Sequence, residues 1–222
     1  MNILSFEKQV RVIGALTEGV SIRATERLTD VHRDTIMRFG LKVGQGCYWL
    51  HNHMMCDLQV NTLELDEAWA FIQKKQKHVT DSDPVERGDC YLWIALDANR
   101  KAIISYLVGK RTAEDARAFL ADMRARILNR PQVTSDGYAP YVDAVDQAFG
   151  GEVDYAMLQK IYQSDGSGDD AAHRYSPGRV IGIEKKIIQG SPDWDKISTS
   201  YVERQNLTLR MHMRRFTRLT ND

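Results

Sequence analysis

The segment "LELDEAWAFI" (63–72) decides the fold, because it is an apolar, aromatic run that carries a carboxylate, Asp66, inside it. Such a run predicts a strand, and a charged carboxylate in a buried strand is costly unless it has a partner. Two more acids have comparable settings: Asp136 ends a short strand just before a glycine, and Glu203 lies near the start of a basic amphipathic helix. Three converging carboxylates suit a pair of Mg²⁺ ions in phosphoryl transfer on nucleic acid, which is our leading hypothesis.

The composition is that of an ordinary globular protein. With 222 residues, 43% of them apolar and 27% charged, the chain can build one large domain, or a large and a small one. No apolar run approaches the ~20 residues needed to cross a bilayer, and the amino-terminal "MNILSFEKQV" lacks a signal pattern. Three cysteines, an odd number, fit a reducing compartment. We therefore expect a cytoplasmic protein with no membrane partner.

The charge is balanced overall but unevenly distributed. A formal net charge of zero argues against a protein that coats DNA with a uniformly basic surface. The closing segment, however, contains five arginines with no acid between them: Arg204, Arg210, Arg214, Arg215 and Arg218. The middle of the chain holds most of the acids. This segregation predicts a basic face beside an acidic metal pocket, although solvated helix charges alone would give the same pattern.

The amino-terminal region predicts a small helical domain over residues 1–48. Residues 5–45 divide into three short helices, with Ser21 as the expected N-cap of the second. Helix, short turn and helix with small residues at the crossing is typical of a helix-turn-helix DNA-binding domain. Arg33 and Arg38, on the third helix, are then the expected DNA contacts. The alternative is a helical cap that binds no ligand.

A cluster of potential zinc ligands follows this domain. Cys47, His51, His53 and Cys56 all fall within one ten-residue stretch. Their spacing matches no paired Cys-x-x-Cys arrangement, and few backbones could wrap a tetrahedral site so tightly. We therefore expect residues 45–61 to be a continuing helix or a linker with incidental Cys and His.

Residues 49–222 predict an α/β domain with a mixed sheet and flanking helices. The expected elements are strands at 59–72, 90–98 and 101–109, a helix at 112–129, a strand at 132–136, a helix at 138–149, a strand at 152–162, a loop at 164–179, a strand at 180–190 and a closing helix at 197–219. Thr112 is the expected cap of the first helix, and Asp97 belongs to a hairpin turn. This is the element order of an RNase-H-like domain, in which the first strand's acid comes beside the end of the fourth strand and a late helix completes the site.

The three acids would then have distinct tasks. Attack on a phosphodiester develops charge on the entering and the leaving oxygen, and two metal ions roughly 3.5–4 Å apart can hold both. Asp66 would bridge the two ions, while Asp136 and Glu203 would each hold one side. Glu64 shares a strand face with Asp66 and is the reserve candidate.

Four segments resemble a known family over almost the whole chain. They are "GVSIRATERLTDVHRDTIMR" (19–38), "ELDEAWAFIQKKQKH" (64–78), "TSDGYAPYVDAV" (134–145) and "VIGIEKKIIQGSPDWDKISTSYVERQNLTLRMHMRRFTRLTN" (180–221). The most specific part is "STSYVERQN" (198–206) with its arginine-rich continuation. These segments resemble transposases of the insertion-sequence-one family, which are DDE-type enzymes. This sequence departs from the family pattern in two respects. Similar relatives often carry a cysteine-rich zinc element before the helix-turn-helix, which is not found here. The pattern also usually continues past "RLTND", which is expected either of a truncated copy or of a deliberately shortened chain.

The resemblance implies an RNase-H-like core that cleaves inverted-repeat transposon ends and transfers them to a target. The catalytic and metal-binding triad carries over onto Asp66, Asp136 and Glu203, with two Mg²⁺ or Mn²⁺ ions per site. The implied partners are double-stranded DNA, as transposon ends and as target, and further copies in a homodimer or higher oligomer. The implied setting is a bacterial or archaeal nucleoid.

Three arginines near the closing acid are further candidate DNA contacts. Arg210 lies seven residues after Glu203, hence nearly two turns along the same helix face, where it could hold a phosphate. Arg204 points elsewhere and would contact DNA nonspecifically or pair with an acid, and Arg214 continues the basic run. Two other functions fit the sequence: an RNase-H-like nuclease without strand transfer, and a non-catalytic DNA-binding regulator or transposon remnant.

Overall fold

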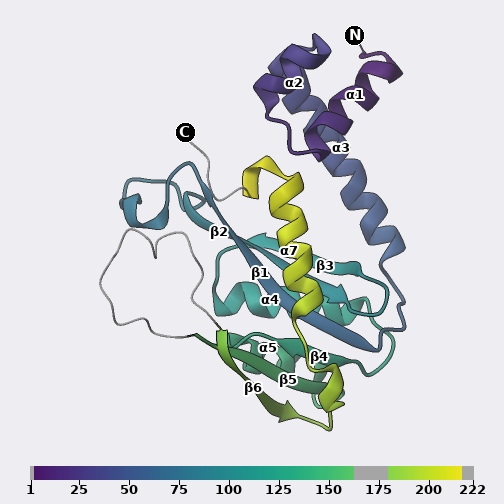
Figure 1. The fold of residues 1–222 in the computed structure, drawn as a ribbon, viewed down its shortest axis with the longest axis vertical. Coiled ribbons are helices and arrows are strands. Elements are labelled where there is room, and N and C mark those ends of the chain that lie inside the picture. Colours follow the sequence, from purple (N-terminus) through teal and green to yellow (C-terminus); the bar gives the residue numbers. More distant parts are fainter. Residues whose placement is uncertain (1–2, 163–179, 217–222) are drawn as a thin grey trace.

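A computed structural model describes residues 3–162 and 180–216, which form a mixed sheet with helices on both faces and a helical group at the amino terminus (Figure 1). The sheet has the order β3-β2-β1-β4-β5-β6. Its strands are β1 (Thr62–Ile72), β2 (Gly88–Asp97), β3 (Ala102–Gly109), β4 (Gln132–Ser135), β5 (Asp154–Tyr162) and β6 (Val180–Gln189). The predicted loop at 164–179 lies outside the described residues.

The pairing pattern identifies the fold class. Strands β1, β2 and β3 form an antiparallel meander, β4 pairs parallel to β1, and β5 pairs parallel to β4. Strand β6 then returns antiparallel along β5. The predicted RNase-H-like α/β fold is therefore confirmed. Asp97 was expected in the hairpin turn but is the last residue of β2, and its Oδ1 accepts from the backbone of Asn99 in that turn at 2.8 Å.

Helices cover the two faces of the sheet. α4 (Ala113–Ala125) and α5 (Pro140–Phe149) lie on one face and α7 (Ser200–His212) on the other (Figure 1). Thr112 caps α4 as predicted, because its hydroxyl accepts from the Asp115 backbone at 3.2 Å.

The alternation of side chains along β1 explains why its acids point to different faces of the sheet. Leu63 and Leu65 are fully buried in the core that α4 and α5 cover. Because successive side chains of a strand point to opposite faces, Glu64 and Asp66 face α7. The next residue, Glu67, returns to the face of α4 and α5.

The amino-terminal region is a group of three helices, as predicted. They are α1 (Phe6–Thr17), α2 (Ile22–Thr29) and α3 (Arg33–Met54), around a small core of Val12, Val31 and Ile36. The third helix continues to Met54, which is the first of the two alternatives for residues 45–61, and it passes through residue 48, where we placed the domain boundary. Its end meets the sheet, with His51 Nε2 lying 3.0 Å from the carbonyl oxygen of Ile103.

The end of the closing helix differs from the prediction. The closing helix was predicted to run to residue 219, which is wrong: α7 ends at His212, Met213 is extended, and Arg214–Phe216 form a separate 3₁₀ turn.

Cys47 and Cys56 are exposed, and neither belongs to the one group of described side chains close enough to hold a metal ion. No helix within the described ranges is both long and apolar enough to span a membrane.

The amino-terminal helices touch the far end of α7 at Gly19. This glycine has a φ of +74°, and a β-carbon built on it would come within 3.1 Å of the backbone oxygen of Met211. Gly150 also has a positive φ, +54°, but no atom lies within 4 Å of such a carbon. The two positions therefore share backbone strain and differ in the contact with α7.

We expect Gly19→Ala and Gly150→Ala each to lower the free energy of unfolding by about 1 kcal/mol, because alanine is strained at positive φ. Only Gly19→Ala should also speed amide exchange at the end of α7, where the Met213 N–H bonds the Leu209 oxygen at 2.8 Å. Denaturant unfolding and hydrogen exchange measure the two effects. Equal exchange of that amide in both variants would show that the contact does not hold α7.

Candidate active site

The register of β1 and β4 brings two of the predicted acids level with each other. These parallel strands pair Glu64 with Thr134, so Asp66 and Asp136, each two residues further on, come side by side. Strand β4 ends at Ser135, which leaves the edge of β1 open from this point. A cavity of about 550 Å³ opens there, and the three predicted acids, Asp66, Asp136 and Glu203, all line it.

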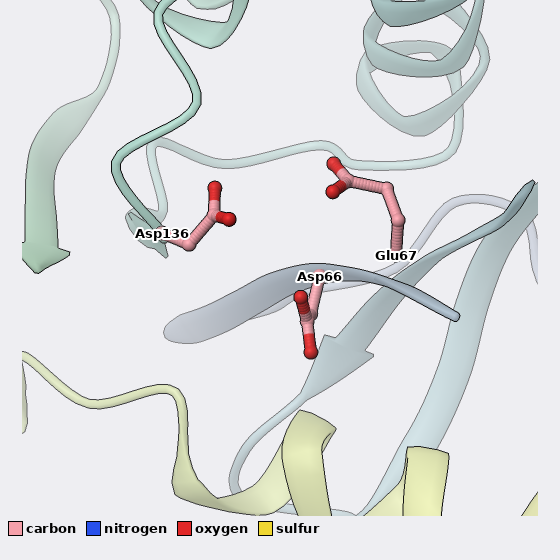
Figure 2. A group of neighbouring side chains, drawn as sticks. All are labelled: Asp66, Glu67 and Asp136. Atoms are coloured by element: carbon pink, nitrogen blue, oxygen red, sulfur yellow. The ribbon is translucent and has the colours of Figure 1, made fainter. Parts of the chain in front are cut away.

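The acids that lie closest together are not the predicted three. Oxygens of Asp66, Glu67 and Asp136 lie within 4.8 Å of one another. Figure 2 shows the carboxylates of Glu67 and Asp136 on one side of the β1 ribbon and that of Asp66 on the other, toward α7. Glu203 stands apart, since its carboxylate accepts from Lys160 Nζ and, at 2.7 Å, from the Thr199 hydroxyl.

The ionised carboxylate of Asp66 is unfavourable in its surroundings. Burial, together with the nearby carboxylates of Asp136 and Glu203, raises its pKa to about 6, although hydrogen bonds from the Glu67 backbone and from Asn206 oppose the rise. The Asn206 amide donates to Asp66 Oδ2 at 2.8 Å. A carboxylate that is desolvated and surrounded by other acids is stabilised by a cation, which is the usual condition of a metal ligand.

Glu67 is a buried acid whose role the sequence did not reveal. Its side chain is 3% exposed, and burial raises its pKa to about 7, with Asp136 adding to the rise and the Tyr141 hydroxyl and Arg111 opposing it. Its Oε1 is buried and has no hydrogen-bond partner of normal geometry among the described residues. Strand alternation sends Glu67 to the face opposite Asp66, so the sequence indicated only a neighbour of the candidate ligand.

Arg111 is the cation of this acidic group. One of its nitrogens, Nη2, lies 3.2 Å from Glu67 Oε2 and 3.2 Å from Asp136 Oδ2. Its guanidinium lies over the ring of Tyr138, 4.2 Å from the ring centre. Arg111 precedes α4 in the chain and has no sequence motif around it, so only the three-dimensional arrangement identifies it.

The reserve candidate, Glu64, has a different environment. It is 1% exposed and does not line the cavity within the described part of the chain. Its Oε2 accepts from the backbone N–H groups of Tyr201 at 2.7 Å and Val202 at 2.9 Å. These N–H groups at the start of a helix have no partner inside the helix, and a carboxylate also suits the helix dipole there. Glu64 therefore fixes the start of α7, the helix that carries Glu203.

The candidate DNA-contacting arginines lie in different settings. Arg33 and Arg38 are exposed on α3, Arg204 is exposed on α7, and Arg214 is exposed in the 3₁₀ turn that follows α7. Arg210 is half-buried, and its Nη1 is fully buried. Their contact with DNA remains a prediction.

The donors of the cavity fit a hard divalent cation. Mg²⁺ and Mn²⁺ prefer carboxylate oxygens, and the cavity wall offers those of Asp66, Asp136 and Glu203. The raised pKa of Asp66 shows that its charge is poorly compensated by protein groups alone. The nitrogen and sulfur ligands that would favour zinc do not line this cavity in the described residues.

Comparison with known proteins gives distant structural similarities only. No family model and no curated protein matches the chain. A cryo-EM structure of the piggyBac transposase synaptic complex with hairpin DNA is similar over 92% of this chain and 56% of that one, with 10% identity and a TM-score of 0.42. The Mos1 transposase paired-end complex with the left transposon end is similar over 68% and 58%, with 14% identity and a TM-score of 0.27. The chain thus spans under two thirds of either structure, and such values assign it neither a family nor an activity.

We expect Asp66→Asn to stabilise the metal-free protein at high pH only. The pKa of Asp66 rises from 3.8 to about 6 on folding, so the folded state binds more protons between these values and stability falls as the pH rises. Removing the charge should add about 2–3 kcal/mol to the free energy of unfolding near pH 8 and nothing below about pH 4. Urea unfolding in EDTA measures this.

Asp154→Asn is the control with the opposite sign. A hydrogen bond from Arg130 lowers the pKa of Asp154, so its charge stabilises the fold at neutral pH and that stability is lost on acidification. This variant should be less stable than wild type near pH 8. If Asp66→Asn changed stability equally at both pH values, burial of its charge would not be the cause.

A second substitution tests the attachment of α7. Glu64→Ala leaves the buried N–H of Val202 and the part-buried N–H of Tyr201 without their acceptor, so we expect a loss of about 2–4 kcal/mol in the free energy of unfolding. The amides of Tyr201 and Val202 should exchange faster with solvent. Glu64→Gln keeps an acceptor oxygen and should lose less. Unchanged amide protection in Glu64→Ala would rule out the anchoring role.

Proposed function

We propose that this protein is a DDE-type DNA transposase that cleaves and joins DNA by metal-dependent phosphoryl transfer. The observation that carries the proposal is the meeting of Asp66 and Asp136 at the open edge of β1, with Glu203 across the same cavity. The RNase-H-like sheet supports it by aligning β1 with β4. The resemblance to the insertion-sequence-one family supplies the finer expectation, that the substrates are inverted-repeat transposon ends and a target duplex.

The three acids divide the work of holding two Mg²⁺ or Mn²⁺ ions. Asp66 would contact both ions from the rigid centre of β1, and Asp136 and Glu203 would each hold one. Bound there, the ions would activate the attacking hydroxyl and balance the charge on the leaving oxygen. Asn206 fixes the orientation of Asp66 by its 2.8 Å hydrogen bond.

Glu203 would have to give up its ion pair with Lys160 in order to bind a metal ion. In the structure its carboxylate pairs with Lys160, a residue of β5 that also lines the cavity. The Thr199 hydroxyl holds the other oxygen of Glu203 at 2.7 Å, so the carboxylate keeps one fixed contact when Lys160 moves away. Lys160 is then free to face the phosphate that the acids surround.

DNA would contact the protein at two places. The exposed positions of Arg33 and Arg38 on α3 suit phosphate or groove contacts by the amino-terminal helices. Arg210, two turns after Glu203 on α7, suits a phosphate close to the cavity, and Arg204 and Arg214 suit weaker, sequence-independent contacts. Two DNA ends must be handled together for strand transfer, which agrees with a homodimer or higher oligomer on DNA.

The test is a cleavage and strand-transfer assay with Mg²⁺, DNA that carries the flanking genomic repeats, and a supercoiled target. We expect end cleavage and joined products from the wild type. Asp66→Asn, Asp136→Asn and Glu203→Gln should each lower the rate at least about 10²–10³-fold, as expected for groups that stabilise transition-state charge. Binding of end DNA should be nearly unchanged.

Asp195→Asn, at an exposed acid away from the cavity, is the matched control and should remain active. Cleavage without joined products would contradict transposition and indicate a nuclease. End binding without cleavage would indicate a non-catalytic DNA-binding protein. Wild-type activity in Asp66→Asn would remove the basis of the assignment.

A further inference from the structure

Arg111 lies between two carboxylates that differ in their exposure to solvent. Its Nη2 is 3.2 Å from both Glu67 Oε2 and Asp136 Oδ2. The Glu67 side chain is 3% exposed, whereas that of Asp136 is 38% exposed and lines the cavity. Arg111 therefore has a buried anchor on one side and an open, metal-accessible acid on the other.

Tyr138 makes two further contacts with Arg111. The guanidinium lies 4.2 Å from the centre of the Tyr138 ring, and the Tyr138 hydroxyl donates to the Arg111 carbonyl oxygen at 3.0 Å. Within the described part of the chain, both carboxylate contacts use Nη2. An arginine carries five N–H donors in a rigid fork, so the remaining donors can serve another anion.

We infer that Arg111 binds a backbone phosphate of the DNA substrate at the wall of the acidic cavity, and that Glu67 positions it there. The inference rests on the proposed function, because the ligand is a phosphodiester brought to this cavity. Carboxylates repel such a ligand, and a held cation beside them lowers that barrier. When Asp136 binds a divalent cation, its hold on Arg111 weakens, while Glu67 continues to hold the guanidinium.

The competing explanation is that Glu67 is itself a metal ligand. Its carboxylate belongs to the group of acids within 4.8 Å. However, the shared contact places Arg111 Nη2 at equal distances from Glu67 and Asp136, so the guanidinium already bridges these two acids. Glu67 also comes from the strand face opposite Asp66 (Figure 2). A positioning role and a ligand role predict different results in a double-mutant cycle.

The cycle uses Arg111→Ala, Glu67→Met and the double variant, because methionine fills the site of Glu67 without offering an acceptor. The first readout is the affinity for a labelled random-sequence duplex in Ca²⁺ over a range of salt. Each single variant should weaken binding about tenfold at low salt and reduce the salt slope by about one, as for one lost phosphate contact. The double variant should lose no more than Arg111→Ala alone.

The second readout is Mn²⁺ binding without DNA, measured by electron paramagnetic resonance. A positioning role leaves Mn²⁺ affinity undiminished in Glu67→Met, and Glu67→Gln, which keeps an acceptor for Arg111, should restore much of the DNA affinity. The control pair is Arg117→Ala and Glu114→Gln, an exposed ion pair of α4 with a 3.1 Å contact, which should leave the salt slope unchanged. If thermal unfolding shows that Glu67→Met does not fold, Glu67→Leu, which also offers no acceptor, replaces it in the cycle.

Three results would overturn the inference. The first is an unchanged salt slope in Arg111→Ala. The second is a tenfold or greater loss of Mn²⁺ affinity in Glu67→Met, with and without Arg111→Ala, which would make Glu67 a ligand. The third is additive loss of DNA affinity in the double variant. Failure of the proposed function is separate, since it would appear as no Mn²⁺ binding and no end cleavage by the wild type, whatever the salt slopes.

Discussion

The desolvation of Asp66 is the constraint on which the rest of the site depends. A carboxylate inside a buried strand loses its hydration, and two other acids face it across one cavity. The fold offsets this cost with polar partners for every one of these acids. Asn206 donates to Asp66, Arg111 pairs with Asp136, and Lys160 pairs with Glu203. The acids can thus remain close together before any divalent cation arrives, at a cost that cation binding would relieve.

Helix α7 connects the acidic site to both the central strand β1 and the amino-terminal helices. Its first turn is held by the buried carboxylate of Glu64, its middle by the hydrogen bond from Asn206 to Asp66, and its end by the close approach of Gly19. The helix that positions Glu203 is therefore tied both to β1 and to the amino-terminal helices. A displacement of those helices on a ligand would be transmitted to the end of α7 through packed backbone rather than through a flexible linker.

The sequence predicted the fold well where periodicity and burial agree. The apolar run with Asp66, the two following strands and the capped helix after Thr112 all lie where their patterns indicate. The pattern also located the acids that line the cavity. It failed at the end of the closing helix, because the basic amphipathic repeat continues past Met213 with no glycine or proline to mark a stop. The sequence left residues 45–61 open between a continuing helix and a linker, and the structure shows that α3 continues to Met54 and contacts β3 near its end.

The polar partners could not be predicted, because they depend on elements that meet only in the folded chain. Arg111 precedes α4, forty-four residues after Glu67 in the sequence, and belongs to no recognisable motif. Glu64 and Glu67 appeared in the sequence as a possible substitute for Asp66 and as its neighbour. In the structure the first anchors a helix and the second holds a cation, and the strand's period of two is the reason they diverge. β1 thus carries three acids within four consecutive residues, and each has a different place. Glu64 lies at the start of α7, Asp66 lines the cavity, and Glu67 lies on the face of the sheet that α4 and α5 cover.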